Sequence, residues 1–416
     1  MIPFCFITLL IFGNLSFDDG LISDIENQLM IKGFEDIRVL TDSKGIIIEY
    51  ENRIYRYPIR AIKEIMEIIS SRMRDETSVT LIPHNRGLPL YSITFSIVEY
   101  KRLLDTKPEL NRGINSLWKA FKALTKKPSA NCDEFQKTDT SFDTGREDNS
   151  GSFFHRKFNI LLIPQFKAVY GAAVEPVKSQ FNLVPEINAS FWKGMLLTSQ
   201  LVIPIQNELE PEDDNLRSGL LTLNQVNSWF FNVFTSVTAG YFTQRRYGLD
   251  LEIRKYMYNG RWSIGINSGY TGYAAYIDGI WYYSDVGLFT WLMDIEYWIS
   301  RIDMKLRYAY GKFLYGDKGW RLDISRRSDE YQLGFFVYKT VGEENVGFTF
   351  GLPVPPAKNL HFGSLTLGLA KEFNQEYRYR SYREDGVQYN TGHCVDKFLN
   401  GLTPERIIKQ LKEMEN

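Results

Sequence analysis

The stretch YGKFLYGDKGW (residues 310–320) joins two runs in which apolar and charged residues alternate, DMKLRY (303–308) and RLDISRR (321–327). The Gly-Asp-Lys-Gly sequence between them is typical of a tight reversal of the chain. Because successive side chains of a strand point to opposite faces, each run has one apolar face and one charged face. The stretch therefore predicts a β-hairpin whose two faces meet different surroundings.

The same alternation recurs in residues 247–255, where tyrosine, leucine and isoleucine alternate with glycine, aspartate, glutamate and arginine. A soluble sandwich or barrel would bury the apolar face, whereas an outer-membrane barrel turns it to lipid and lines a wet lumen with the charges. The alternation alone leaves both arrangements open. In the second arrangement the lumen-lining residues are Asp250, Glu252, Arg254, Asp303, Lys305, Arg307, Arg321 and Asp323.

Strand length and aromatic placement favour the outer-membrane arrangement. Candidate strands between residues 158 and 373 run to roughly ten residues or more, and membrane-spanning strands need about nine to eleven. Aromatic residues gather near the predicted strand ends, as in WYY (281–283), which suits the girdles of a barrel. The prediction is a mainly β fold, an antiparallel outer-membrane β-barrel of about 12 strands over residues 157–375.

An apolar run at the N-terminus, MIPFCFITLLIFG (1–13), has the length of a signal-peptide core and is too short to span a bilayer. It has no basic segment before it, and a buried N-terminal strand is the alternative interpretation. No later run reaches roughly 18 consecutive apolar residues, the length of a membrane-spanning helix. We therefore predict a secretory signal over residues 1–17 and membrane insertion through strands.

Outside the predicted barrel, the chain divides into three further segments. Residues 18–105 predict a small periplasmic α/β domain, because short strand patterns flank a segment in which Ile62, Ile65 and Ile69 recur at helical spacing. Residues 106–156 are polar and turn-rich, which is typical of a linker. Residues 376–416 predict a polar periplasmic tail that ends in a helix capped near Thr403.

The composition excludes several classes of protein. A net charge of −1 and a pI near 6.5 give no basic excess for nucleic-acid binding. The four histidines are far apart in the sequence, so we predict no metal site. With Cys5 inside the predicted signal, Cys132 and Cys394 either form one disulfide or remain free thiols.

The sequence carries no motif for catalysis, such as a Walker loop, a nucleophile elbow or a dinucleotide fingerprint. Asp250 and Glu252 could imitate the carboxylate pair of a glycosidase, but Arg254 on the same face favours a charge-compensated lumen. The acidic run at 208–214 lacks the spacing of a calcium loop. We therefore predict a protein that is not an enzyme and needs no cofactor.

Residues 310–337 resemble the signature hairpin of YjbH-type outer-membrane proteins of exopolysaccharide and capsule biosynthesis. In that family Gly-Arg-Phe-Leu-x-Gly-Asp-x-Gly leads into Ser-Arg-x-Phe-Asp. The stretches YENRIYRYPIRAI (50–62), RGLPLYSITFSI (86–97), LVIPIQNEL (201–209) and AGYFTQRRYGLDLEIRKY (239–256) extend the resemblance over most of the chain. The hairpin residues that fit the pattern are Gly311, Phe313, Leu314, Gly316, Asp317, Gly319, Ser325, Arg326 and Asp329.

The chain also departs from this family. Ser328 stands where an aromatic residue is usual, and residues 341–347 lack the family's Phe-Gly-x-Gly-Ser-Phe-Asp-Lys-Gly element. Longer relatives carry duplicated α/β and barrel units, and this chain has one of each. The turn at Gly316, Asp317 and Gly319 also has a purely structural interpretation, because glycine permits positive φ and aspartate caps turns.

The resemblance implies a role in the export of exopolysaccharide or capsule, or in its assembly at the surface, at the bacterial outer membrane. The expected partners are outer-membrane lipid, the polysaccharide and export proteins of the periplasm, without nucleic acid. Two alternatives stay open at this point. One is a general porin-like channel, and the other is a periplasmic β-rich protein that binds or cleaves glycans.

Overall fold

A computed structural model describes residues 19–42, 45–74, 76–105, 156–170, 177–209, 214–258, 260–277, 280–328, 331–378, 385–399 and 407. The predicted signal peptide, Cys132, the predicted linker apart from its last residue, and nearly all of the predicted C-terminal helix lie outside these residues. Within them, no helix has the length and apolar character needed to cross a membrane.

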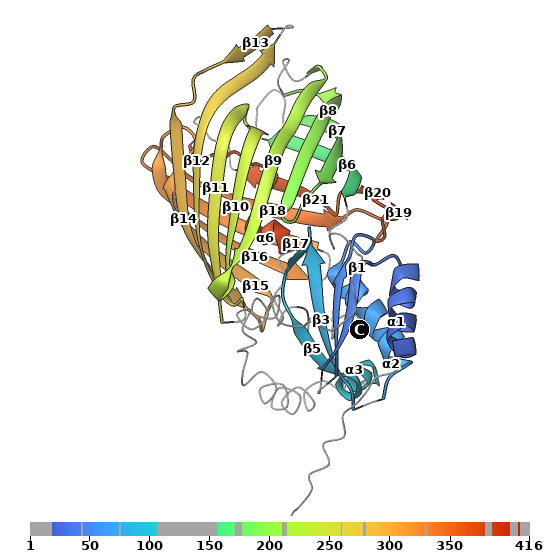
Figure 1. Cartoon of the computed structure of the whole chain (residues 1–416). Helices are drawn as coiled ribbons and strands as arrows, with labels where there is room; N and C mark the ends of the chain where they lie inside the picture. The colour runs from blue at the N-terminus through green and yellow to red at the C-terminus, as the bar shows by residue number, and fades with distance from the viewer. Residues whose placement is uncertain are drawn as a thin grey trace, which may run out of the picture.

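The N-terminal unit, residues 19–105, contains a five-stranded mixed sheet and three helices (Figure 1). The sheet order is β1-β2-β3-β4 with β5 on β3, and β2 and β3 are parallel because α2 crosses over between them. The elements are α1 (Asp19–Ile31), β1 (Glu35–Asp42), β2 (Gly45–Glu51), α2 (Pro58–Ser70), β3 (Ser78–Asn85), β4 (Leu88–Pro89), β5 (Ile93–Ser96) and α3 (Ile97–Asp105).

The core of this unit is apolar and dry. Helix α2 begins with Pro58, whose missing N–H costs nothing at a first helical position, and its apolar residues recur at helical spacing. Ile62 and Ile65 of α2 are fully buried against Ile25 of α1 and Ile48 of β2. Ile407, far along the chain, is fully buried in the same core, so the C-terminal segment returns to the N-terminal unit.

The second sheet, called the large sheet below, contains sixteen strands in the described residues. Its strands are β6 (Lys157–Tyr170), β7 (Val177–Ser190), β8 (Met195–Asn207), β9 (Arg217–Trp229), β10 (Val233–Phe242), β11 (Arg246–Met257), β12 (Trp262–Ile277), β13 (Ile280–Tyr283), β14 (Leu288–Ile299), β15 (Met304–Lys312), β16 (Lys318–Ser328), β17 (Tyr331–Thr340), β18 (Glu344–Pro353), β19 (Leu360–Phe362), β20 (Leu365–Leu369) and β21 (Glu372–Arg378). A 3-10 turn, η3 (Phe230–Asn232), joins β9 to β10, and the short helix α6 (Val395–Phe398) follows β21.

Neighbouring strands along the path from β6 to β18 pair antiparallel, and β13 pairs only with β12. The path ends at β19 on one side and at β21 on the other. Residues 365–373, at the end of the predicted barrel, therefore belong to two strands. β20 pairs parallel with β6, and β21 pairs antiparallel with β18. The chain passes between these two ends at Ala370, whose N–H donates to Leu162 O at 2.9 Å.

Two strand predictions differ from the structure. The prediction is about twelve strands, whereas the described part of the large sheet has sixteen: twelve of at least nine residues between β6 and β18, and the short strands β13, β19, β20 and β21. The predicted tail began at residue 376, yet β21 continues to Arg378. Short strands and strand ends carry too few alternations to be recognised in the sequence.

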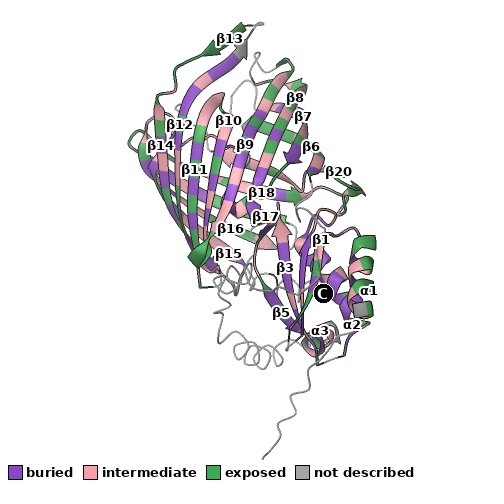
Figure 2. Cartoon of the chain, viewed as in Figure 1, coloured by how far each residue is buried: buried purple, intermediate pink, exposed green. Residues whose placement is uncertain are grey.

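The large sheet has a polar inner face and an apolar outer face. Buried and exposed residues alternate along its strands (Figure 2). On β11, Asp250 and Glu252 are each 6% exposed, whereas Leu249 and Leu251 between and beside them are 57% and 38% exposed. The same inversion holds on β14, where Asp294 is 5% and Met293 is 53% exposed. The apolar side chains of this sheet therefore point away from its interior.

The N-terminal unit packs against the end of the large sheet at which β6 begins. Arg53 donates to Phe158 O at 2.6 Å and to Asn159 Oδ1 at 2.7 Å, and pairs with Glu35 at 2.8 Å. Lys157, at the start of β6, reaches back to Glu51 at 2.6 Å and also contacts Asp36. These partly and fully buried charges fix the unit on the sheet.

Candidate functional site

Arg254 on β11 lies at the centre of a buried charge cluster on the inner face. Its guanidinium donates to both carboxylate oxygens of Asp294 on β14, at 2.9 and 3.0 Å, which is a bidentate pair. It also pairs with Glu252 at 3.0 Å and with Glu296 at 3.3 Å. A Cβ at Gly265 would lie 2.6 Å from this guanidinium, so glycine there leaves room for the arginine head group.

A line of alternating charges continues around the inner face from this cluster. Arg307 on β15 lies 3.2 Å from Asp294 and 3.9 Å from Asp323 on β16. Arg321 pairs with Asp323 at 2.8 Å and with Glu376 of β21 at 3.3 Å. Cations and carboxylates thus compensate one another from β11 to β21.

Seven of the eight predicted lumen residues lie on the inner face, and the ion pairs bring six of them into this network. The seventh, Asp250, accepts hydrogen bonds from Asn267 at 2.9 Å and from Tyr389 at 2.7 Å. Asp303 differs from the prediction, because it lies in the turn before β15 with φ of +48°. There its carboxylate accepts a hydrogen bond from Trp298 Nε1 at 2.8 Å.

The inner face of β7 to β10 is polar, and Glu186 is a carboxylate on it that accepts hydrogen bonds from Asn188 and Gln200. Asn224 on β9 is fully buried and donates to Ser236 at 2.8 Å and to Thr238 at 2.9 Å. Thr198 donates to Asn188 in the same way between β8 and β7. One side of the interior therefore presents mainly hydroxyl and amide groups around the Glu186 carboxylate, and the other presents compensated charges.

Residues 385–399, called the strap below, cross the inner face from one end of the strands to the other (Figure 1). At one end Gly386 N donates to Asp317 Oδ2 at 2.8 Å, and Leu314 N donates to Val387 O at 3.0 Å. At the other end the ring of Phe398 lies 6.5 Å from Phe234, at the start of β10. The predicted tail thus begins inside the curve of the large sheet.

The middle of the strap contacts side chains on both the mainly uncharged side and the charged side of the inner face. Tyr389 donates to Asp250 and stacks on Phe242 with ring centroids 5.3 Å apart. A Cβ at Gly269 would lie 1.6 Å from the Tyr389 hydroxyl, so this glycine leaves the space that the tyrosine fills. Further contacts are His393 to Thr222 at 2.9 Å, Val395 N to Glu252 at 2.9 Å, and Asp396 to Lys305 at 3.2 Å.

The signature turn between β15 and β16 folds inward onto the strap. Phe313 and Leu314 are each 1% exposed, and Gly316 has φ of +88°, which favours glycine. A Cβ at Gly319 would lie 2.0 Å from Lys339 O, so close strand packing also requires that glycine. Burial raises the pKa of Asp317, the acceptor for the strap. The turn therefore holds the strap as well as reversing the chain.

The β3–β4 turn of the N-terminal unit reaches the inner face at the opposite end. Arg86 and Gly87 both have positive φ, and Arg86 donates to Asn224 at 2.9 Å. Its guanidinium lies over the Phe398 ring, 5.6 Å from the centroid, and burial lowers the pKa of Arg86 to about 10. Leu88 completes an apolar cluster there with Val226, Phe234, Val395, Phe398 and Leu399.

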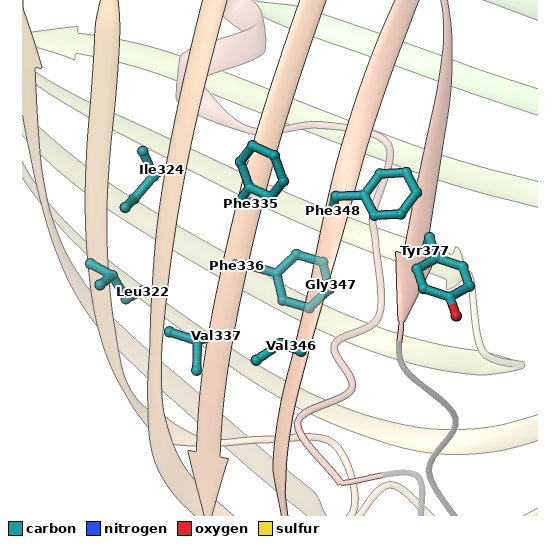
Figure 3. A pocket seen from close by; sticks show the side chains of 9 residues that line it. All are labelled: Leu322, Ile324, Phe335, Phe336, Val337, Val346, Gly347, Phe348 and Tyr377. Atoms are coloured by element: carbon teal, nitrogen blue, oxygen red, sulfur yellow. The ribbon is translucent and has the colours of Figure 1, made fainter.

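On the outer face the apolar residues form a band with charges at its edges. On β16, Trp320, Leu322 and Ile324 lie between the exposed residues Lys318 and Arg326. Figure 3 shows a shallow hollow of about 430 Å³ in this face, over β16, β17, β18 and β21. Its lining is Leu322, Ile324, Phe335, Phe336, Val337, Val346, Gly347, Phe348 and Tyr377.

The described residues hold no group of three or more His, Cys, Asp or Glu that could bind a metal. Cys394 is a free thiol in the strap, and its possible partner Cys132 lies outside the described residues. Sequence reasoning omitted Asp294 and Glu296, although they alternate with apolar residues in LFTWLMDIEYWI as the predicted ones do. It also missed Arg86 and Tyr389, for which the local sequence gives no signal.

A family model described as "Exopolysaccharide biosynthesis protein YbjH" matches residues 18–352 of the chain. The match includes the N-terminal unit and the strands from β6 to β17, and it reaches into β18. The strap lies beyond the matched residues, while its contact at Asp317 lies within them. No curated protein matches the chain.

Proposed function

The chain belongs to the YjbH family of exopolysaccharide biosynthesis proteins, and from this premise we propose that it is an outer-membrane β-barrel that assists exopolysaccharide export or surface assembly. The observation that carries the proposal is the inverted polarity of the large sheet. Leu249, Leu251 and Ile253 are 57%, 38% and 41% exposed, while Asp250, Glu252 and Arg254, which alternate with them, are buried. Lipid is the medium that accommodates such a surface, because soluble proteins rarely expose large apolar patches.

The height of the apolar band supports placement in a bilayer. On β16 Arg326 lies eight positions after Lys318, which corresponds to about 26 Å along the strand and less along the axis of a tilted barrel. Outer-membrane barrels carry an apolar band of about 25 Å. Exposed aromatic residues gather at the strand ends nearer the N-terminal unit, namely Trp192, Trp229, Phe230, Phe231 and Tyr258.

The two ends of the large sheet support closure of the barrel through β20 and β21. These strands follow one another in the chain and pair with β6 and β18 respectively, so the polypeptide itself spans the gap. Phe373 of β21 lies 6.5 Å from Phe166 of β6, measured between ring centroids. In lipid every backbone polar group needs a partner, which favours a closed barrel over an open sheet.

In this arrangement the N-terminal unit faces the periplasm and offers its surface to proteins of the export machinery. The strap fills part of the interior, which favours assisted or controlled passage over a permanently open porin. The proposal includes no catalytic step, because Asp294 and Glu296 are each ion-paired with more than one cation. A carboxylate held in this way is poorly placed to transfer protons.

Replacing Leu251 by Arg tests the orientation. Leu251 lies in the middle of the outer band, so the charge is expected to cost about 2–4 kcal/mol of folding free energy in a bilayer. Tyr258→Arg is the control, because Tyr258 lies at a strand end, where a charge costs about 0–1 kcal/mol. Heat-modifiable gel mobility of outer-membrane fractions measures assembly.

We expect poor assembly for Leu251→Arg and normal assembly for Tyr258→Arg. Purification of folded wild-type protein from the aqueous fraction, without detergent, would overturn the membrane proposal. The role in export is tested by deleting the gene and quantifying surface polysaccharide in cells complemented with wild-type protein. Unchanged polysaccharide in the deletion strain would overturn that role.

A further inference from the structure

We propose that the inner-face groove now occupied by residues 385–394 is the path of the polysaccharide, and that these residues are a displaceable plug. The inference rests on the proposed function, because it requires a barrel that passes a polymer. Residues 385–394 would leave the groove, and residues 395–399 of the strap would stay in place.

The strap has two parts that differ in what holds them. Residues 385–394 attach mainly through hydrogen bonds from or to Asp317, Thr243, Asp250 and Thr222, with one ring contact between Tyr389 and Phe242, and they pair with no strand. Residues 395–399 are anchored differently. Val395, Phe398 and Leu399 are buried with Leu88 of the N-terminal unit. The first part can detach in exchange for water, whereas detaching the second would expose apolar surface.

The surface beneath the plug is suited to a sugar chain. Removing residues 385–394 would uncover the hydroxyl groups of Thr222 and Thr243, the Asp250 carboxylate and the ring of Phe242. The hydroxyl and carboxylate groups exchange protein hydrogen bonds for hydrogen bonds to water or to sugar hydroxyls.

Both ends of the plug connect to parts of the protein that could control it. Asp317 in the family's signature turn holds Gly386 and acts as the latch. At the other end Arg86 of the N-terminal unit packs on Phe398, and Ile407 is fully buried in that unit's core. Movement of the N-terminal unit would therefore pull on the anchor of the plug.

A substitution of Gly269 on β12 should displace the plug, because this glycine lies against Tyr389. A Cβ there would overlap the Tyr389 hydroxyl at 1.6 Å, so Gly269→Val removes the space for this tyrosine. Ser268→Val is the matched control, because Ser268 is the next residue on β12 and points to the outer face. Tyr389→Ala is a second variant, which releases the plug without adding atoms to the sheet.

The experiment combines thiol labelling and conductance in full-length protein with Cys5 and Cys132 replaced by serine. Cys394 lies half-buried at the end of the plug and reports its release to a bulky maleimide. We expect Gly269→Val and Tyr389→Ala to label about tenfold faster than wild type or Ser268→Val. In planar bilayers both should show conductance steps that wild type and Ser268→Val lack.

Heat-modifiable mobility selects the variants that fold. Faster labelling without conductance, or unchanged labelling in both folded plug variants, would overturn the proposal, as would steady conductance by wild type. None of these results concerns membrane assembly or polysaccharide level in the deletion strain. Failure of the plug is thus distinguishable from failure of the proposed function.

Discussion

The N-terminal unit and the large sheet sort the same kinds of residue in opposite directions. In the N-terminal unit Ile48, Ile62 and Ile65 are fully buried in a common core. In the large sheet Leu251 is 38% exposed while its neighbour Glu252 is 6% exposed. Both regions show regular apolar periodicity in the sequence, so the pattern defines two faces but does not say which one is buried. The medium around each region decides that.

The largest expected effect comes from placing a charge in the dry core. Ile65→Asp should destabilise the N-terminal unit by about 4 kcal/mol or more, because the carboxylate would have no partner among the isoleucines. Trypsin digestion of full-length protein, with fragments identified by mass, should show cleavage within residues 19–105. Glu67→Asp, at an exposed position on the same helix, is the control. If Ile65→Asp resisted trypsin as well as wild type, the N-terminal unit would not depend on an apolar core, and the contrast with the large sheet would fail.

A smaller effect is expected from removing a charge on the inner face. Arg254→Met leaves the carboxylates of Asp294, Glu296 and Glu252 without their shared cation and should cost about 3 kcal/mol. Urea unfolding of protein assembled in lipid vesicles, followed by gel mobility, measures the loss. Lys255→Met is the control, because Lys255 is the next residue on β11 and is exposed on the outer face.

The double variant Arg254→Met/Asp294→Leu sharpens this test. It removes one of the abandoned carboxylates and should recover part of the lost stability. A loss below about 1 kcal/mol for Arg254→Met would mean that water solvates the cluster as it does surface ion pairs. The inner face would then resemble a protein surface more than a core.

The faces of the large sheet could be predicted from the sequence because strands alternate strictly. Lys305, Arg307 and Asp323 were placed correctly on one face by counting alone. Asp303 was not, because its strand begins one residue later, at Met304, and strand ends leave no periodic signal. The division of residues 365–378 into β20 and β21 depends on pairing with distant strands, which local pattern does not encode.

The strap could not be predicted for a different reason. Residues 385–399 are polar, aperiodic and rich in turn-forming residues, features shared by solvated tails. Their place is set by single tertiary contacts, such as Tyr389 over Gly269 and Gly386 at Asp317. The composition correctly indicated a polar tail. It gave no indication that residues 385–399 lie against the inner face of the large sheet.

The junction between the two regions gives the smallest predicted effect. His84 of β3 is half-buried near Lys193, Asp36, Lys157 and Arg38, and burial, followed by the Lys193 charge, lowers the pKa of His84 to about 4. An unfolded histidine has a pKa near 6.5, so the unfolded state binds more protons between these values. Stability is therefore fully present above about pH 6.5 and is lost as pH falls toward about 4.

Replacing His84 by Gln should flatten this pH dependence. Between pH 7 and pH 5 the histidine should remove at most about 2 kcal/mol of stability, and less because solvent reaches it. Thermal unfolding of the N-terminal unit in full-length protein, measured from pH 7.5 to pH 4, compares wild type with the variant. The wild-type midpoint should fall more steeply, since protonation places a cation beside Lys193 and Lys157 where the two regions meet. Parallel curves for the two proteins would show that other groups control the junction.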